Sequence, residues 1–377
     1  MKEIVLGGRV LITGRGSLAS LRGLAAKRAL IVTGGSAMQK SGVLARVEEL
    51  LRAGGGVCEV FSGVRPNPDP QAVLAGLERM RRFKPDTVVA VGGGSAIDAA
   101  KVMALLFEHP VGRFADLAEA TLPNSRSLIR LVAIPSTSGT GAEVTKAAVI
   151  TFPDRNLKIG LKSEALVPDV AILDAELAMT MPPSLVAETG LDAVTHAVEC
   201  YINPNLDDFT EPLAREAVAG LLEWLPVSYR EKTLDSREKV HNYQCMAGLA
   251  FTNVGLGMAH GIAHAIGGKF GLGHGLINAI ALPEVLAFNS RDAEVARRLG
   301  RLAQTVGAED FVQAVRKLNR LLAIPASFRA TGLGEEAFRQ ALPELVANSL
   351  QGSTRVNPVK MDAESMAAVL ERLYFGR

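Results

Sequence analysis

Hydrophobic and polar positions alternate along the first half of the chain in a pattern that predicts short buried strands separated by helices. Apolar and β-branched runs predict five strands, at Arg28–Thr33, Val57–Phe61, Asp86–Gly92, Ile129–Pro135 and Asp169–Asp174. Helical spacing between them predicts helices at Ser36–Arg52, Asp69–Arg82 and Ser95–Phe107. Apolar strands that alternate with helices are typical of a parallel sheet covered on both faces.

Two further runs in this half, Lys146–Phe152 and Leu157–Leu161, predict a hairpin that turns at Pro153 and Asp154. The pattern then changes at Met181-Pro182-Pro183-Ser184, where two prolines end the preceding element and a serine can cap a helix. Beyond this point a 3.6-residue period dominates and β-branched runs disappear. We therefore expect an α/β domain at residues 1–182 with a parallel, Rossmann-like sheet, and an all-α domain at residues 183–377.

Composition and charge narrow the class of protein. The 377 residues are 48% hydrophobic and 21% charged, which is a normal globular mixture. A net charge of +2 predicts neither nucleic acid nor an anionic membrane as a partner. Three cysteines far apart, without a C-x-x-C pair, favour a reducing compartment. No signal peptide or membrane-spanning apolar run is recognisable, so we expect a cytoplasmic protein.

A glycine-rich segment, Gly92-Gly93-Gly94-Ser95, joins a buried strand to a helix. Glycines let a backbone approach a ligand closely, and a helix N-terminus offers N–H groups to a phosphate. An ordinary strand-to-helix turn is the alternative interpretation, but three successive glycines favour binding of a pyrophosphate. A second loop of this kind, Pro135–Glu143, follows another apolar strand. Two such loops at the carboxyl ends of parallel strands predict a nucleotide site.

Histidines gather in the second half in a way that predicts a metal site. Three of the six histidines in the chain, His260, His264 and His274, fall within fifteen residues. Asp192 and His196 are four residues apart, so they share one face of a helix. A satisfied core histidine is the better interpretation of His196 alone. Asp192, His196, His260 and His274 together supply one carboxylate and three imidazoles, which suit Fe²⁺ or Zn²⁺ better than Mg²⁺ or Ca²⁺. An ion with a remaining charge of +1 would polarise an alcohol oxygen and favour its deprotonation.

These motifs together resemble those of the iron-containing (group III) alcohol dehydrogenase family. The resemblance runs from Thr13 to about Pro358. Its most specific segments are GGGSAIDAAK at 92–101, IPSTSGTGAEVT at 134–145, GLDAVTHAVE at 190–199, and HGIAHAIGG at 260–268 with GHGLINAIALP at 273–283. The family implies a dinucleotide-binding first domain and a helical second domain, with metal and substrate bound in the cleft between them. It also implies a homodimer or a larger homo-oligomer.

The resemblance further implies a role for single residues. The matching metal positions are Asp192, His196, His260 and His274, the same four that the donor chemistry selects. His264 matches a histidine near the nicotinamide, and we predict that it relays a proton. Asp98 is a second candidate catalytic residue. The cofactor positions carried over are Asn67, Gly94, Ser95, Asp98, Thr137, Ser138, Thr140, Thr145 and Lys158, to which the phosphate argument adds Gly93.

One departure from the family pattern predicts the choice of cofactor. The second strand runs into Gly34-Gly35-Ser36, where NAD-specific members usually carry an aspartate. A carboxylate there would bind the ribose 2′-hydroxyl and repel a 2′-phosphate. Two glycines leave room for that phosphate, and Ser36 at a helix start would receive it. We therefore expect NADP(H) to be favoured over NAD(H).

The predicted activity is hydride transfer between NAD(P) and a small primary alcohol or aldehyde, and three alternatives stay open. A dehydroquinate-synthase-like lyase would need several cationic residues for its charged substrate, but residues 176–206 contain no Lys or Arg, and residues 244–290 contain only Lys269. A maleylacetate-type reductase would not need the metal ligands. A non-catalytic metal- or nucleotide-binding protein is the third alternative, although both sets of motifs are complete.

Overall fold

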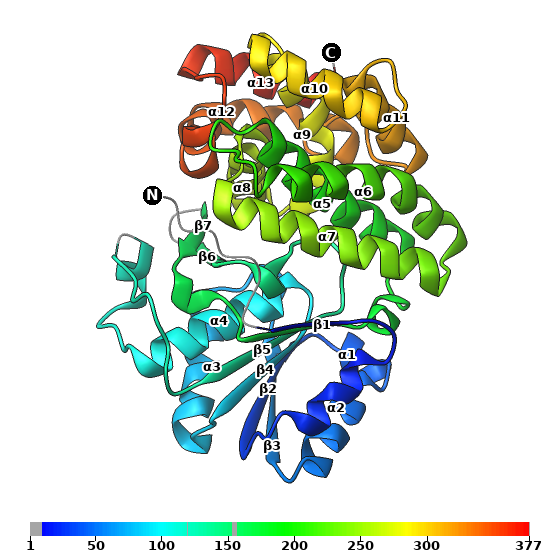
Figure 1. Cartoon of the computed structure of the whole chain (residues 1–377). Coiled ribbons are helices and arrows are strands. Elements are labelled where there is room, and N and C mark those ends of the chain that lie inside the picture. Colours follow the sequence, from blue (N-terminus) through cyan, green and yellow to red (C-terminus); the bar gives the residue numbers. More distant parts are fainter. Residues whose placement is uncertain (1–9, 119, 153–156, 377) are drawn as a thin grey trace. The chain divides into compact units, whose positions relative to one another are not determined.

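The computed structural model describes residues 10–118, 120–152 and 157–376 (Figure 1). These residues form two compact units. The first lies within Met1–Pro153 and Ile159–Met181, and the second within Asp154–Lys158 and Pro182–Arg377. The predicted turn at Pro153 and Asp154 lies outside the described residues. The assignment of domains to 1–182 and 183–377 stays a prediction about which segments fold and function separately.

A six-stranded parallel sheet forms the centre of the first unit, in the order β1-β8-β5-β4-β2-β3. Its strands are β1 (Val10–Thr13), β2 (Arg28–Gly34), β3 (Val57–Val64), β4 (Thr87–Gly92), β5 (Arg130–Pro135) and β8 (Val170–Leu173). All five predicted strands are confirmed. The sequence pattern missed β1, which pairs with β8 and is an outermost strand of the described sheet. The run is apolar but only four residues long, and three of its residues are exposed in the structure.

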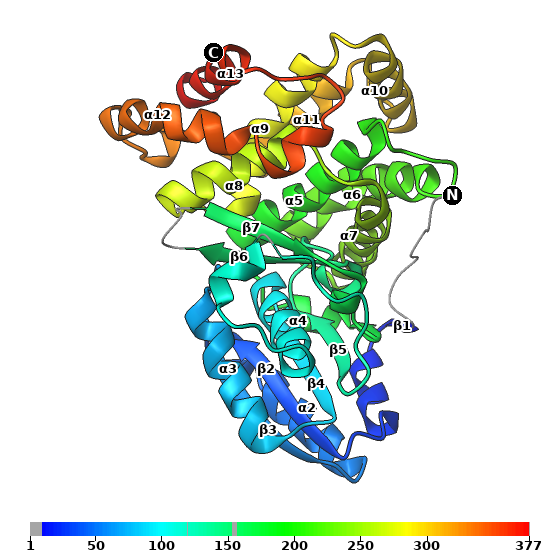
Figure 2. The same ribbon diagram turned by 90° about the vertical axis from the view of Figure 1, so that its left-hand side faces the viewer.

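Helices cover both faces of this sheet (Figures 1 and 2). One apolar cluster joins the sheet to α3 (Pro70–Phe83) and α4 (Gly94–Glu108), and a second joins its other face to η1 (Ser17–Gly23) and α2 (Val43–Ala53). The helix predicted at Ser36–Arg52 is interrupted, because Gly42 adopts a φ of 77° between α1 (Ala37–Lys40) and α2. Instead of the one long helix that was predicted, the structure therefore has the short helix α1 followed by α2.

The strand order places the three predicted loops, which follow β2, β4 and β5, at the carboxyl-terminal end of the sheet. The connection after β2 leads outward to β3, whereas the chain continues from β4 on the other side of β2 towards β5. Such a reversal opens a crevice at the carboxyl ends of the two strands. Val32 pairs with Ala90, and Gly92 pairs with Pro135. The segments that follow β2, β4 and β5 therefore leave the sheet side by side.

The predicted hairpin is confirmed as a separate two-stranded sheet of β6 (Ala147–Phe152) and β7 (Leu157–Lys162).

Among the described residues, no single helix has the length and apolarity needed to cross a membrane. One strongly bent pair, Leu234–Val254 with Met258–Phe270, meets the test by length and composition alone.

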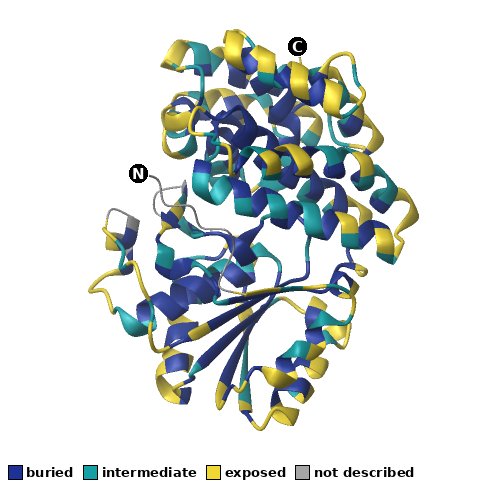
Figure 3. Ribbon diagram, in the orientation of Figure 1, coloured by how far each residue is buried: buried dark blue, intermediate teal, exposed yellow. Residues whose placement is uncertain are grey.

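The second unit is helical, as the 3.6-residue period predicts. Its helices are α5 (Pro183–Ile202), α6 (Glu211–Glu231), α7 (Leu234–Val254), α8 (Met258–Phe270), α9 (His274–Asn289), α10 (Ala293–Thr305), α11 (Phe311–Leu321), α12 (Glu335–Ser349) and α13 (Ala363–Phe375). Helix α5 packs against α6, α7 and α9, and it is buried on nearly every side (Figure 3). A helix that is apolar all round belongs in a core, so polar side chains on α5 require partners inside the protein.

We predict that Gly275→Ala destabilises the packing of α5 on α9. A Cβ at Gly275 would lie 2.2 Å from the carbonyl oxygen of Glu188, and a backbone atom cannot move aside as a flexible side chain can. We expect a loss of about 1–3 kcal/mol in the free energy of unfolding, measured by thermal or denaturant unfolding. The control is Gly300→Ala in α10, where a Cβ would meet nothing within 4 Å. Alanine there should instead stabilise the protein by up to about 1 kcal/mol, and equal effects at both positions would contradict the packing argument.

Candidate active site

The predicted metal ligands come from three helices of the second unit. Helix α5 carries Asp192 and His196 one turn apart, α8 carries His260, and α9 begins at His274. Asp192 and His260 are almost completely buried, whereas 27% of the His274 side chain is exposed. The group is therefore inside the helical unit but accessible from the side of His274.

Three of the four predicted ligands converge in the structure. One ligand atom each from Asp192, His260 and His274 lies within 4.8 Å of the other two. The Oδ1 atom of Asp192 is 3.7 Å from Nε2 of His260 and 3.7 Å from Nε2 of His274. Ligand atoms bound about 2.1 Å from one tetrahedral ion lie about 3.4 Å apart. The donor atoms and their spacing therefore fit a transition-metal ion.

The fourth predicted ligand, His196, lies beside this group without being part of it. Its ring stacks on His260 with centroids 4.5 Å apart, and on Phe251 at 4.4 Å. The imidazole is thus held in a stack adjacent to the other ligands. Its direct binding to the ion stays a prediction.

Two buried residues that the sequence analysis did not assign to the site hold the ligands in place. Glu199 lies 2.6 Å from Nδ1 of His260 and also accepts hydrogen bonds from the backbone N–H groups of Gly257 and Ala259. Asn278 donates from Nδ2 to Asp192 Oδ1 over 2.7 Å. Their signal in the sequence is weak, because only the fold brings them to the ligands. Glu199 could have been suspected as an acid in a buried helix, seven residues after Asp192.

The charges and the burial around the group shift the pKa values of its members. Burial by itself would raise the pKa of Asp192, but neighbouring imidazoles, first among them His196 and His274, lower it below its ordinary range. Burial would lower the pKa of His260, yet hydrogen bonds with Asp192 and Glu199 raise it to about 9. Burial lowers the pKa of His274 to about 3. Without an ion, a proton therefore resides on His260 at neutral pH, in the place where a metal would act.

His264 and Lys158 lie near the ligand group. The His264 ring stacks on that of His274 with centroids 5.3 Å apart. Burial, together with neighbouring charges, lowers the pKa of His264 well below its ordinary value, so the ring is neutral. Lys158 is buried with its ammonium against Gly267, and burial lowers its pKa while Asp192 opposes that shift. The count of cations in the helical half missed this lysine, because it is carried by β7.

The two predicted phosphate loops lie together in the first unit, at the carboxyl ends of β4 and β5. Gly92 has a φ of 152°, and Gly93 is the N-cap residue of α4, which has no side-chain cap. A Cβ at Gly94 would lie 2.7 Å from Cγ2 of Thr140, so a glycine is required for the two loops to meet. A Cβ at Gly93 would likewise lie 3.4 Å from the hydroxyl of Thr137. Close approach and an uncapped helix start are the features that suit a phosphate.

The remaining predicted cofactor residues are placed differently from one another. The Asn67 backbone, with a φ of 57°, donates to the hydroxyl of Ser95 over 3.3 Å. Asp98 accepts from the Val149 backbone, and burial raises its pKa to about 6. Thr145 is buried and accepts from the Lys101 ammonium through both its carbonyl and hydroxyl oxygens. Ser138 is buried in the second loop. Their contacts with a cofactor stay predictions.

The structure corrects the space expected at Gly34. A Cβ there would lie 2.6 Å from the carbonyl oxygen of Val64, so β3 already fills the position. Gly35 is different, because it has a φ of 58° and a Cβ there would meet nothing within 4 Å. Ser36 begins the four-residue helix α1 and is exposed. Of the two glycines, only Gly35 therefore has open space beside it.

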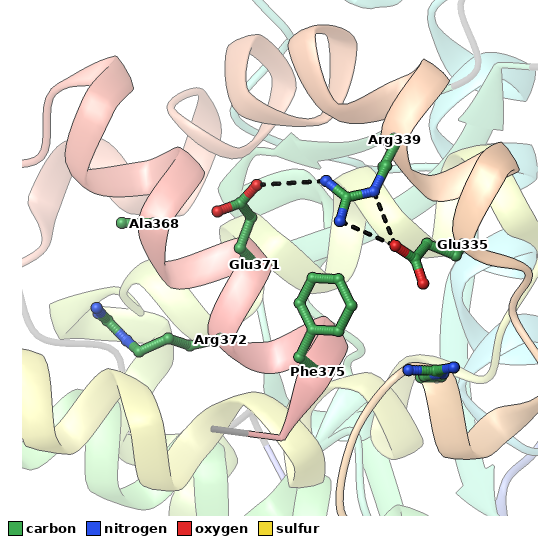
Figure 4. A pocket seen from close by; sticks show the side chains of 7 residues that line it. Glu335, Arg339, Ala368, Glu371, Arg372 and Phe375 are labelled. Carbon is green, nitrogen blue, oxygen red and sulfur yellow. Dashed lines mark hydrogen bonds and ion pairs between the residues drawn. The ribbon is translucent and has the colours of Figure 1, made fainter.

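A cavity of about 690 Å³ lies elsewhere in the second unit, between α12 and α13 (Figure 4). Arginines dominate its lining, but two of them are paired with carboxylates. Arg339 donates to Glu335 and lies 4.0 Å from Glu371, and Arg372 contacts Glu284. None of the predicted site residues lines this cavity, so it is not part of the candidate active site.

Comparison with known proteins places the chain in a family. The model of iron-containing alcohol dehydrogenases matches residues 9–175, and the C-terminal model of the same family matches residues 186–374. The chain belongs to the iron-containing alcohol dehydrogenase family, which makes it an oxidoreductase of the alcohol dehydrogenase class.

Individual relatives match over nearly the whole chain. An NADPH-dependent butanol dehydrogenase of Clostridium saccharobutylicum is 39% identical, over 98% of this chain and 97% of its own length. The 1-propanol dehydrogenase PduQ of Citrobacter freundii is 36% identical, over 99% and 100%. The solved iron-containing alcohol dehydrogenase of Thermococcus thioreducens superposes with a TM-score of 0.92 at 31% identity, covering 100% of both chains.

We predict that divalent metal binds more tightly as the pH rises. The His260 pKa of about 9 means that an ion must displace a proton below that pH. Affinity for Co²⁺, measured by competition with a chromogenic chelator, should increase by up to about tenfold per pH unit between pH 6.5 and 9. Glu199→Gln removes one of the carboxylates that raise this pKa, so its affinity should level off at a lower pH. An affinity independent of pH would contradict the assignment of the proton.

Proposed function

We propose that this protein is a metal-dependent alcohol dehydrogenase that transfers a hydride between NADP(H) or NAD(H) and a small primary alcohol or aldehyde. The single observation that carries the proposal is the convergence of Asp192, His260 and His274 on one point. Their donor atoms match the iron or zinc that the family name and the chemistry suggest. The named activities of the butanol and propanol relatives support the substrate class.

The residues of the chain would divide the work as follows. Asp192, His260 and His274, with His196 as the proposed fourth ligand, would hold Fe²⁺ or Zn²⁺. Such an ion supplies a Lewis acid that polarises the alcohol oxygen. His264 is stacked beside His274, and from this place next to the ligand group it would relay the proton that the alcohol loses.

The first unit would bind the cofactor through the loops that follow the carboxyl ends of β2, β4 and β5. Gly93, Gly94 and Ser95 at the start of α4 would receive the pyrophosphate. Asn67, Asp98, Thr145 and the threonine-rich loop at Thr137–Thr140 would contact the rest of the dinucleotide, and so would Lys158 of the second unit. A homodimer or a larger homo-oligomer remains part of this proposal.

Two of the alternatives are disfavoured by specific observations. The converging ligand atoms have no use in a metal-free reductase of the maleylacetate type. A dehydroquinate-synthase-like lyase fits poorly with relatives named as alcohol dehydrogenases over nearly the full length. The buried Lys158 adds only one cation near the ligand group. Turnover of a short alcohol separates the proposed enzyme from the lyase and from a non-catalytic binding protein.

We predict that His260→Ala and His264→Ala have different effects. The chain reconstituted with Fe²⁺ under anaerobic conditions should oxidise short primary alcohols, followed by the absorbance of the reduced nicotinamide. His260→Ala should lose both the metal and the activity. His264→Ala should retain one metal per chain while its kcat falls about 100-fold, because general acid–base catalysis contributes on that scale. Elemental analysis distinguishes the two, and equal loss of metal would reverse the assignment of His264. Full activity after exhaustive chelation would contradict the metal role.

We predict that the enzyme prefers NADP(H) over NAD(H). Gly35 is the suitable position for testing this preference, because the space beside it is open. Gly35→Asp places a carboxylate in open space, and Asp and Asn both tolerate the positive φ of this residue. Repulsion of the 2′-phosphate should lower the ratio of kcat/KM for NADP to that for NAD by at least about tenfold. Gly35→Asn has the same shape without the charge and should change the ratio little. Gly34→Asp is unsuitable, because its Cβ would collide with Val64. A clear preference of the unmodified chain for NAD(H) would contradict the prediction.

A further inference from the structure

The side chain of Asn278 lies among the proposed metal ligands, although no motif marked it. It belongs to α9, one turn after His274, and it is completely buried. Its amide nitrogen lies 2.7 Å from Oδ1 of Asp192, and 3.2 Å from Nε2 of both His260 and His274. One nitrogen thus faces the ligand atom of every member of the converging group.

The shortest contact determines which way the amide points. A carboxylate oxygen only accepts hydrogen bonds, so the group 2.7 Å from Asp192 must be the NH₂ and not the carbonyl oxygen. An amide nitrogen carries two hydrogens. One is committed to Asp192, and the nitrogen also lies at the longer distance of 3.2 Å from each of the two imidazole nitrogens. The bond to Asp192 is therefore the strong one, since its acceptor carries a charge.

Only one of these contacts is compatible with a bound ion. Each Nε2 atom has a single lone pair, and that pair is needed by a metal. A carboxylate oxygen has two lone pairs, so Oδ1 of Asp192 can face an ion and still accept from Asn278. The bond to Asp192 survives metal binding, whereas the contacts with His260 and His274 do not. Asn278 therefore acts on Asp192.

The carbonyl oxygen of the Asn278 amide is buried and has no hydrogen-bond partner among the described residues. The chain neighbours of Asn278, Ile277 and Ala279, are apolar and completely buried, so a leucine would suit this part of the helix better. A half-satisfied amide in such a place costs stability, which argues that the side chain serves the ligands rather than the fold.

We propose that Asn278 is a positioning residue of the metal site, which holds Oδ1 of Asp192 in the orientation that binds the ion. The inference rests on the proposed function, because it presupposes that Asp192 is a ligand. It complements Glu199, which fixes His260 at the opposite nitrogen of the ring. Outer residues of this kind typically contribute about 10–100-fold to metal affinity.

The test compares variants at two asparagines of the same helix. Asn278→Ala removes the amide, and Asn278→Leu removes it while filling the space. The matched control is Asn289→Ala, because Asn289 is also buried in α9 but its amide pairs with Asn357. Each full-length chain is stripped of metal and titrated with Co²⁺ against a chromogenic chelator. The visible spectrum of the Co²⁺-loaded protein reports the ligand geometry, and thermal unfolding reports stability.

Both Asn278 variants should bind Co²⁺ about 10–100-fold more weakly than the unmodified chain, with a changed Co²⁺ spectrum. Asn289→Ala should lose thermal stability while its affinity and spectrum stay unchanged. Affinities of the Asn278 variants within about twofold of the unmodified chain, or tighter, would overturn the inference while the proposed function stands. Equal weakening by Asn289→Ala would also overturn it. Absence of Co²⁺ binding by the unmodified chain would overturn the proposed function and this inference together.

Discussion

A carboxylate buried in the middle of a helical core is the constraint on which the second unit depends. Asp192 lies on a helix that is enclosed on nearly every side, and an isolated charge in such a place is very unfavourable. Neighbouring imidazoles stabilise the charge of Asp192, and the amide of Asn278 donates a hydrogen bond to it. Glu199 adds a second buried carboxylate, which is satisfied by His260 and by backbone N–H groups at the start of α8.

Close backbone approach is the second constraint, and glycines meet it in both units. Gly275 follows a proposed ligand directly and lets α9 approach the backbone of α5. Gly94 similarly lets the start of α4 meet the threonine loop after β5. In each case a side chain would push apart two segments that carry functional groups. The glycines therefore fix the geometry of the chemistry rather than the flexibility of the chain.

The electrostatics of the ligand group link metal binding to proton binding. In the metal-free protein the carboxylates around His260 keep a proton on that ring, whereas burial keeps His264 and His274 neutral. A metal ion and a proton thus compete for the same position, as expected when ligands must be deprotonated. His264, adjacent but outside the group, remains a neutral imidazole. This separation supports different roles for histidines only four residues apart.

The sequence by itself determined the fold class, the strands with buried apolar runs, the helical second half and the family. These follow from local patterns, because hydrophobic periodicity and glycine-rich turns are written in consecutive residues. It missed β1, an apolar run of only four residues, and it joined α1 to α2 across Gly42. Only the tertiary structure decided that β3 occupies the space beside Gly34, whereas the space beside Gly35 is open. It also decided that burial lowers the pKa of His264 well below its ordinary value. It alone brought Glu199 and Asn278 to the ligands. The physical reason is that space, burial and charge at one residue depend on segments far away in the chain, which no local pattern records.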